Sequence, residues 1–151
     1  MTTIVGIDPG ETTGVCALET PRNGHVFQVV GVYQIPWEDR VSFFRALFTG
    51  GIAQPDGYQL LPEIVAIESF RLRPGRAMEQ VGSEFPSVRV IGIVEAFLSL
   101  CSPQPLLAFQ EPVIIGRCQI LSEHEQLFRG LVHAGDAYRH ARYYYVMHWR
   151  P

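Results

Sequence analysis

The chain contains no lysine, only three cysteines, and no hydrophobic run long enough to span a membrane. Cys16, Cys101 and Cys118 are widely spaced and odd in number, which argues against a disulfide framework or a zinc knuckle. No apolar stretch approaches the roughly 20 residues of a transmembrane helix. The N-terminus lacks the basic segment of a signal peptide. We therefore expect a cytoplasmic protein with buried free thiols and no membrane partner.

A large excess of positive charge is also absent, since the net charge is −3 at pH 7. This charge argues against nucleic-acid binding, but it is unevenly distributed. Residues 1–70 hold three arginines and eight acidic residues, whereas residues 71–151 hold nine arginines and seven acidic residues. Arginine binds phosphate in a bidentate manner, so the second half of the chain could form a phosphate-binding face. A compositional bias would explain the missing lysine equally well.

Hydrophobic periodicity predicts one α/β domain over residues 1–151. The predicted strands are 3–8, 13–19, 26–35, 63–67 and 105–109, and the predicted helices are 37–48, 87–101 and one or two within 122–149. Three successive strands followed by βα units predict a five-stranded mixed sheet flanked by helices. A right-handed crossover would place strand 63–67 beside strand 3–8 and parallel to it. Asp8 and Glu68 would then lie at the same end of neighbouring strands.

Asp8 and Glu68 each end an apolar strand, where an unpaired carboxylate is costly to bury. A divalent cation would offset that cost. For Asp8, hydrogen bonds from the turn amides of residues 10–14 are an equally good explanation. Both hypotheses remain open for Asp8 considered alone.

His133 and Asp136 are three residues apart in a predicted helix, so they share one face of it. A lone histidine is more often a core or capping residue, and a helix acid is more often solvated. The small residues around Asp136, namely Ala134, Gly135, Ala137 and Ala141, indicate close packing instead. With Asp8 and Glu68, this pair makes a set of ligands suited to two hard cations about 3.5–4 Å apart that act on a phosphodiester.

The motifs Gly-Ile-Asp8-Pro-Gly, Ala-Ile-Glu68 and His133-x-x-Asp136-Ala resemble, in order and spacing, those of RuvC-type Holliday junction resolvases of the RNase H-like superfamily. Phage-encoded members are similar in size, which would place the protein in the host-cell cytoplasm. The resemblance implies a Mg²⁺- or Mn²⁺-dependent endonuclease with two ions per site, which cuts four-way DNA junctions by paired symmetric nicks. Asp8, Glu68, His133 and Asp136 match the catalytic metal ligands. Helix 87–101 matches the interface of a homodimer, in agreement with its nearly all-apolar sequence.

The loop after Glu68 is where the resemblance implies contact with DNA. Phe70 would stack on or wedge against a base, although a core anchor is an equally good role for it. Arg71, Arg73 and Arg76 would bind phosphates and so contribute affinity without reading sequence, and a solvated loop is the alternative role for them.

The chain departs from the family in having no lysine near these motifs and in reading Gln-Glu-Pro-Val-Ile-Ile at 110–115, where a basic stretch is expected. The substrate could therefore be a flap, a replication fork or a branched packaging intermediate. A separate alternative is a non-catalytic DNA-binding or interaction relative, and the presence of all four candidate ligands argues against it. The segment from Gly6 to Gly14 also resembles the first phosphate loop of actin- and hexokinase-like ATP-binding proteins. Those proteins need a second domain, for which 151 residues leave no room.

Overall fold

The computed structural model describes the chain except for residues 22–25, 55–56, 58, 71–84 and 150–151. Its strands are β1 (Thr2–Asp8), β2 (Thr13–Thr20), β3 (Gln28–Ile35), β4 (Ile52–Ala53), β5 (Gln59–Leu60), β6 (Ile64–Glu68) and β7 (Leu106–Gln110). Its helices are α1 (Arg40–Thr49), α2 (Pro86–Leu98), α3 (Ile114–Arg117) and α4 (Val132–His148), with 3-10 segments η1 (Trp37–Asp39) and η2 (Ser122–Phe128). No described helix is both long enough and apolar enough to cross a membrane.

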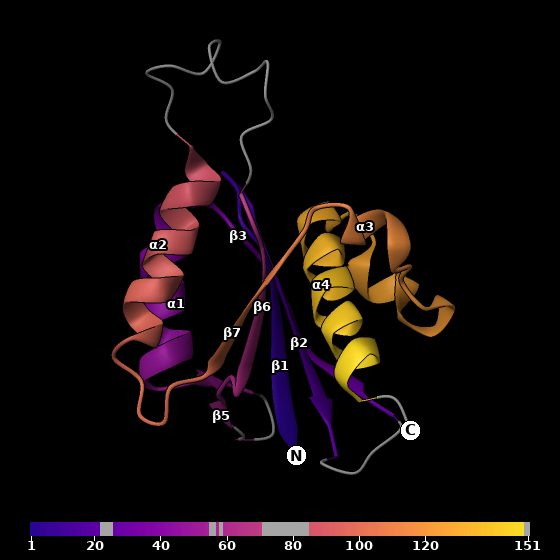
Figure 1. Cartoon of the computed structure of the whole chain (residues 1–151), viewed down its shortest axis with the longest axis horizontal. Helices are drawn as coiled ribbons and strands as arrows, with labels where there is room; N and C mark the ends of the chain where they lie inside the picture. The colour runs from indigo at the N-terminus through magenta and orange to yellow at the C-terminus, as the bar shows by residue number, and fades with distance from the viewer. Residues whose placement is uncertain (22–25, 55–56, 58, 71–84, 150–151) are drawn as a thin grey trace.

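A five-stranded mixed sheet in the order β3-β2-β1-β6-β7 forms the centre of the fold (Figure 1). Strands β1, β2 and β3 pair antiparallel, whereas β6 is parallel to β1 and β7 is parallel to β6. The predicted mixed sheet is therefore confirmed, as is the predicted crossover that places the strand ending at Glu68 beside the strand ending at Asp8. The hairpin β4–β5, which was not predicted, lies in that crossover.

The two faces of the sheet are covered by different helices. Helices α1 and α2 cover one face, α4 and η2 cover the other, and α3 packs beside α4 (Figure 1). Within β1, Val5 and Ile7 belong to the core under α1 and α2, whereas Ile4 belongs to the core under α4. Side chains alternate between the faces of a strand, so Asp8 is on the α4 side.

Helix α2 starts one residue before the predicted helix 87–101 and ends at Leu98, three residues earlier than predicted. The side chains that it buries recur every fourth residue, at Val90, Val94 and Leu98. Val88 remains 45% exposed, so the described chain covers only one side of this apolar helix. In its first turn, the Ser87 hydroxyl donates a hydrogen bond of 2.6 Å to the carbonyl oxygen of Pro9 and so joins α2 to the loop after Asp8.

Three elements differ in detail from the prediction. The expected helical stretch 122–149 is divided into the 3-10 segment η2 and the 17-residue helix α4. Similarly, the predicted helix 37–48 begins as the 3-10 turn η1 and becomes α-helical at Arg40. The strand predicted from residue 26 begins at Gln28.

Candidate active site

Three polar side chains stand side by side where the parallel strands end. Asp8, Glu68 and Gln110 are the last residues of β1, β6 and β7, and the strands are paired in parallel register up to these positions. Residues two apart on a strand share a face, and Ala66, two residues before Glu68, packs in the core under α4. The row therefore lies on the α4 side of the sheet, with two carboxylates in adjacent strands.

Two glycines let α4 lie directly against the backbone of β1 and β2. A Cβ atom at Gly6 would be 1.9 Å from the carbonyl oxygen of Ala137, and one at Gly14 would be 1.9 Å from the carbonyl oxygen of His133. Neither position can carry a side chain while the helix lies at this depth. The facing helix residues are small, and Ala134 and Ala137 are fully buried, as the sequence predicted. This approach brings the first turns of α4 next to Asp8.

His133 contacts Asp8 from α4, with its Nδ1 atom 2.9 Å from Oδ2 of the carboxylate. The side chain of His133 is 45% exposed and that of Asp8 is 15% exposed, so the alternative of a core histidine is wrong. Burial raises the pKa of Asp8; the hydrogen bond with His133 opposes this shift, and the negative charges of Glu68 and Asp136 add to it. The site thus has an excess of negative charge that a cation would relieve.

His140, on α4, contacts the last residue of β6 and the last residue of β7. Its Nε2 atom is 3.2 Å from Oε2 of Glu68, and its Nδ1 atom is 2.8 Å from Oε1 of Gln110. The ring is fully buried. His140 was not among the site residues predicted from the sequence. Its separation of seven residues from His133, or two helical turns, is the signal that could have identified it.

Asp136 forms an ion pair with Arg139, the residue three positions later in α4. Both side chains are mostly buried, with exposures of 21% for Asp136 and 27% for Arg139. Arg139 was also missed, although the i,i+3 spacing of opposite charges was a usable signal. Each of the three carboxylates at the candidate site is therefore paired with a histidine or an arginine of α4.

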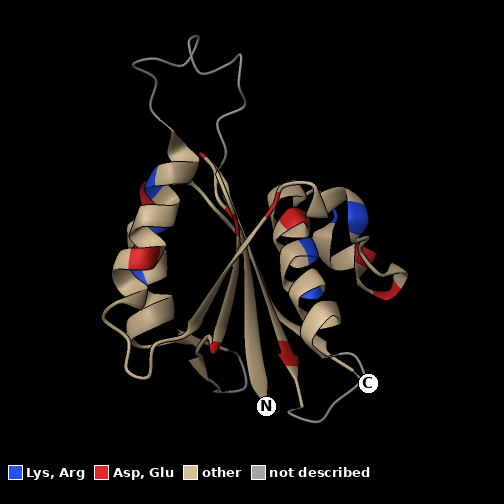
Figure 2. Cartoon of the chain, in the orientation of Figure 1, with Lys and Arg blue, Asp and Glu red and all other residues tan. Residues whose placement is uncertain are grey.

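The donor set fits divalent metal ions in its chemistry, although no three His, Cys, Asp or Glu side chains of the described residues are already gathered closely enough to hold one. Carboxylate oxygens are the preferred ligands of Mg²⁺ and Mn²⁺. Burial raises the pKa of Asp8, and the negative charges of Glu68 and Asp136 raise it further. Acidic residues gather at this end of the sheet and on the adjoining helix (Figure 2). His133 and His140 are hydrogen-bonded to Asp8 and Glu68, and Arg139 forms an ion pair with Asp136.

Of the predicted DNA-binding residues, only Phe70 is within the described residues. It is 37% exposed, and its ring packs on Phe85 at the start of α2, with centroids 5.1 Å apart. This partial packing is compatible with both of its predicted roles. Arg71, Arg73 and Arg76 lie outside the described residues.

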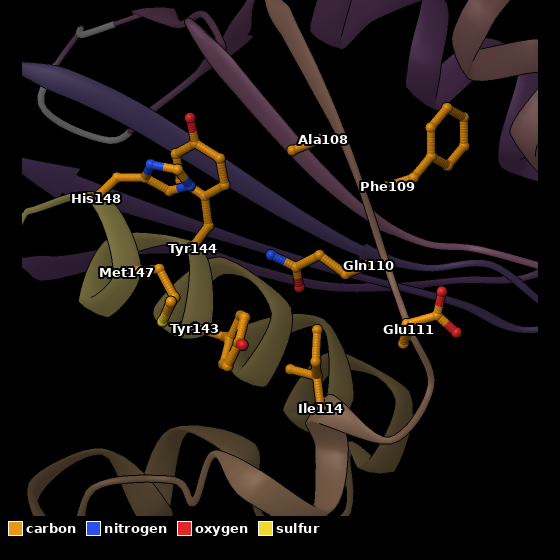
Figure 3. Close-up of a pocket in the computed structure, with 9 residues that line it drawn as sticks. All are labelled: Ala108, Phe109, Gln110, Glu111, Ile114, Tyr143, Tyr144, Met147 and His148. Carbon is orange, nitrogen blue, oxygen red and sulfur yellow. The ribbon is translucent and has the colours of Figure 1, made fainter.

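A pocket of about 320 Å³ opens beside the candidate site, between β7 and the second half of α4 (Figure 3). Gln110 forms part of its wall, and Tyr144 and His148 line it with rings that stack 4.2 Å apart. The amide nitrogen of Gln110 points toward the pocket, while its oxygen is turned to α4 (Figure 3). Gln110 therefore connects this pocket with His140.

No protein-family model and no curated protein matches the chain, but solved structures do. RuvC of T. thermophilus, in complex with a Holliday junction substrate, is similar with a TM-score of 0.54 and 19% identity, over 97% of this chain and 96% of RuvC. The Holliday junction resolvase of fowlpox virus has a TM-score of 0.60 and 11% identity, over 97% and 99% of the two chains. Its complex with Holliday junction DNA gives 0.60 and 10%, over 95% and 96%. At these identities the likeness establishes the fold, which is RNase H-like, as predicted.

Proposed function

We propose that the chain is a structure-selective DNA endonuclease that resolves four-way junctions by paired symmetric nicks. The observation that carries this proposal is the placement of Asp8, Glu68 and Asp136, from two parallel strands and a helix, at one end of an RNase H-like sheet. The similar solved structures include two described as complexes with Holliday junction DNA, which favours branched DNA as the substrate class.

In this proposal, Asp8, Glu68, Asp136 and His133 hold two Mg²⁺ or Mn²⁺ ions. Such ions would activate a water molecule and stabilise the leaving oxygen of the phosphodiester. If Nδ1 of His133 donates its hydrogen to Asp8, Nε2 is left as a free lone pair on a half-exposed ring. A histidine held by a carboxylate in this way is a common arrangement around metal ligands. His133 would then serve as ligand or proton acceptor in a fixed orientation.

The proposed enzyme is a homodimer joined through the outer side of α2. Paired nicks require two active sites, and a dimer with two-fold symmetry provides them in equivalent positions. The exposed part of α2 includes Val88, and Leu100 just beyond the helix is 73% exposed. These apolar side chains are suited to burial against a second copy of the chain.

The proposal can be tested with labelled four-way junction, flap, fork and linear duplex DNA, each incubated with Mg²⁺, Mn²⁺ or EDTA. We expect two nicks at symmetric positions in the junction, with metal only. Asp8→Asn should bind the junction and leave it uncut, whereas Asp39→Asn, at an exposed acid on η1, should cut like the wild type.

Equal cleavage by Asp8→Asn would remove Asp8 from the mechanism. Preferential cutting of flaps or forks would keep the nuclease and replace the junction as its substrate. Junction binding without cleavage under any metal would favour a non-catalytic DNA-binding protein. ATP hydrolysis without cleavage would favour the actin- and hexokinase-like alternative.

A further inference from the structure

His140 is a fully buried histidine whose two ring nitrogens face the last residues of two neighbouring strands. Glu68 and Gln110 are paired in the register of β6 and β7, and the ring reaches both, at 3.2 Å and 2.8 Å. A buried polar ring needs hydrogen-bond partners, and here it has one on each side. The ring thus links the candidate metal ligand Glu68 to a side chain outside the acidic cluster.

The direction of these hydrogen bonds follows from the chemistry of the partners. An ionised carboxylate only accepts, so His140 Nε2 must carry the hydrogen that it shares with Glu68. An amide group can donate or accept, so Gln110 complements Nδ1 whether or not that atom carries a hydrogen. In both arrangements the ring donates to Glu68, and Gln110 prevents it from turning away.

We propose that His140, anchored by Gln110, is the positioning residue that orients the Glu68 carboxylate for metal binding. This inference rests on the proposed function, because it assigns Glu68 to the metal site. Metal binding tolerates little displacement of a ligand oxygen. A partially exposed glutamate side chain can adopt several rotamers, only some of which place the oxygen correctly. The Glu68 side chain is 22% exposed, and the hydrogen bond from His140 selects one of its orientations.

The alternative is that His140 is simply a satisfied core residue, and three substitutions separate the two roles. His140→Gln places an amide N–H near the position of Nε2 and can still donate to Glu68. His140→Asn is polar but too short to reach Glu68. Gln110→Ala removes the second hydrogen-bond partner of the ring, at a residue that lines the pocket (Figure 3). His148→Asn, at an exposed position of the same helix, is the matched control.

The measurements are Mn²⁺ affinity by electron paramagnetic resonance, cleavage rate with saturating Mn²⁺, junction affinity in EDTA, and melting temperature in EDTA. We expect His140→Asn to lose about 10–100-fold in Mn²⁺ affinity or cleavage rate, the usual effect of removing a partner that orients a metal ligand. His140→Gln should recover most of this loss, Gln110→Ala should show a smaller one, and His148→Asn none. Junction affinity in EDTA should be the same for all variants.

Unchanged Mn²⁺ affinity and cleavage in His140→Asn would overturn the inference. So would equal loss in His140→Gln and His140→Asn that follows the fall in melting temperature, because a purely structural role predicts that pattern. If the wild type binds Mn²⁺ in a His140-dependent manner but cuts no branched DNA, the positioning role is supported and the proposed function fails. If the wild type cuts junctions and His140→Asn cuts them equally well, the proposed function survives and the inference is overturned.

Discussion

Replacing Gly14 with alanine should separate α4 from the strands that carry the acidic residues. The new Cβ atom would lie 1.9 Å from the carbonyl oxygen of His133, whereas real Cβ atoms essentially never come closer than 3.0 Å to such a neighbour. The obstacle is backbone on both sides, so no side chain can rotate out of the way. The start of α4 must therefore move outward by at least about 1.1 Å, given those two distances.

This displacement would act on the site more strongly than on the fold. A misplacement of about 1 Å at a catalytic centre can reduce the rate roughly 100-fold, so we expect a loss of this size in junction cleavage by Gly14→Ala. Overpacking a core costs about 1–3 kcal/mol, which corresponds to a fall in melting temperature of roughly 2–12 °C in a domain of this length. The hydrogen bond between His133 and Asp8 should break first, since His133 lies at the point of collision.

The assay is single-turnover cleavage of a labelled four-way junction, with circular dichroism to verify the fold. Gly116→Ala provides the control, because a Cβ atom at Gly116 would have no neighbour within 4 Å. Gly6→Ala should behave like Gly14→Ala, because its Cβ atom would collide with the carbonyl oxygen of Ala137. Folded Gly14→Ala protein that cuts at the wild-type rate would refute the idea that the depth of α4 sets the geometry of the site.

Three further outcomes are expected. In the metal-free protein, Asp8→Asn should raise the melting temperature at pH 7. Burial raises the pKa of Asp8 in the folded state, so the wild type loses stability as the pH rises through that pKa. The gain should vanish below pH 3.8, the ordinary pKa of the carboxyl group, where it is protonated in the folded and the unfolded state. Val88→Glu should convert a dimer of twice the 17.0 kDa chain mass into a monomer in sedimentation velocity, and a wild type that is monomeric at micromolar concentration would contradict the dimer. Arg139→Gln should strengthen Mn²⁺ binding roughly 2–5-fold by calorimetry, because Asp136 would lose a competing ion pair worth about 0.5–1 kcal/mol. Weaker Mn²⁺ binding would show that Arg139 supports the site instead.

The sheet could be predicted from the sequence because its signals are local. The apolar runs that end in Asp8 and Glu68 have strand length, and the crossover rule then determines that these two strands are parallel neighbours. The alanines and glycine around Asp136 likewise predicted the close packing of α4. In contrast, the two-residue strands β4 and β5 and the four-residue helix α3 are too short to give a periodic pattern.

The partners of the acidic residues could not be predicted in the same way. The contacts of His140 join residues that are 30 and 72 positions apart in the chain, so no local pattern reveals them. The pairing of His133 with Asp8 depends on how closely α4 approaches the sheet. The backbone contacts of α4 at Gly6 and Gly14 set this distance, and they exist only in the folded chain. The acidic residues at one end of the sheet were predictable, whereas the side chains that contact them were not.

The hydrogen bond from Ser87 to the carbonyl oxygen of Pro9 gives α2 a mechanical role in the proposed dimer. It connects the first turn of α2 to the loop that follows Asp8. In the proposed dimer, α2 and this one hydrogen bond would therefore connect each active site to the interface at the two-fold axis. The distance between the two centres would then be set by the way the two α2 helices cross. A substitution that altered this crossing angle would shift the stagger between the two nicks along the DNA while every metal ligand stayed in place.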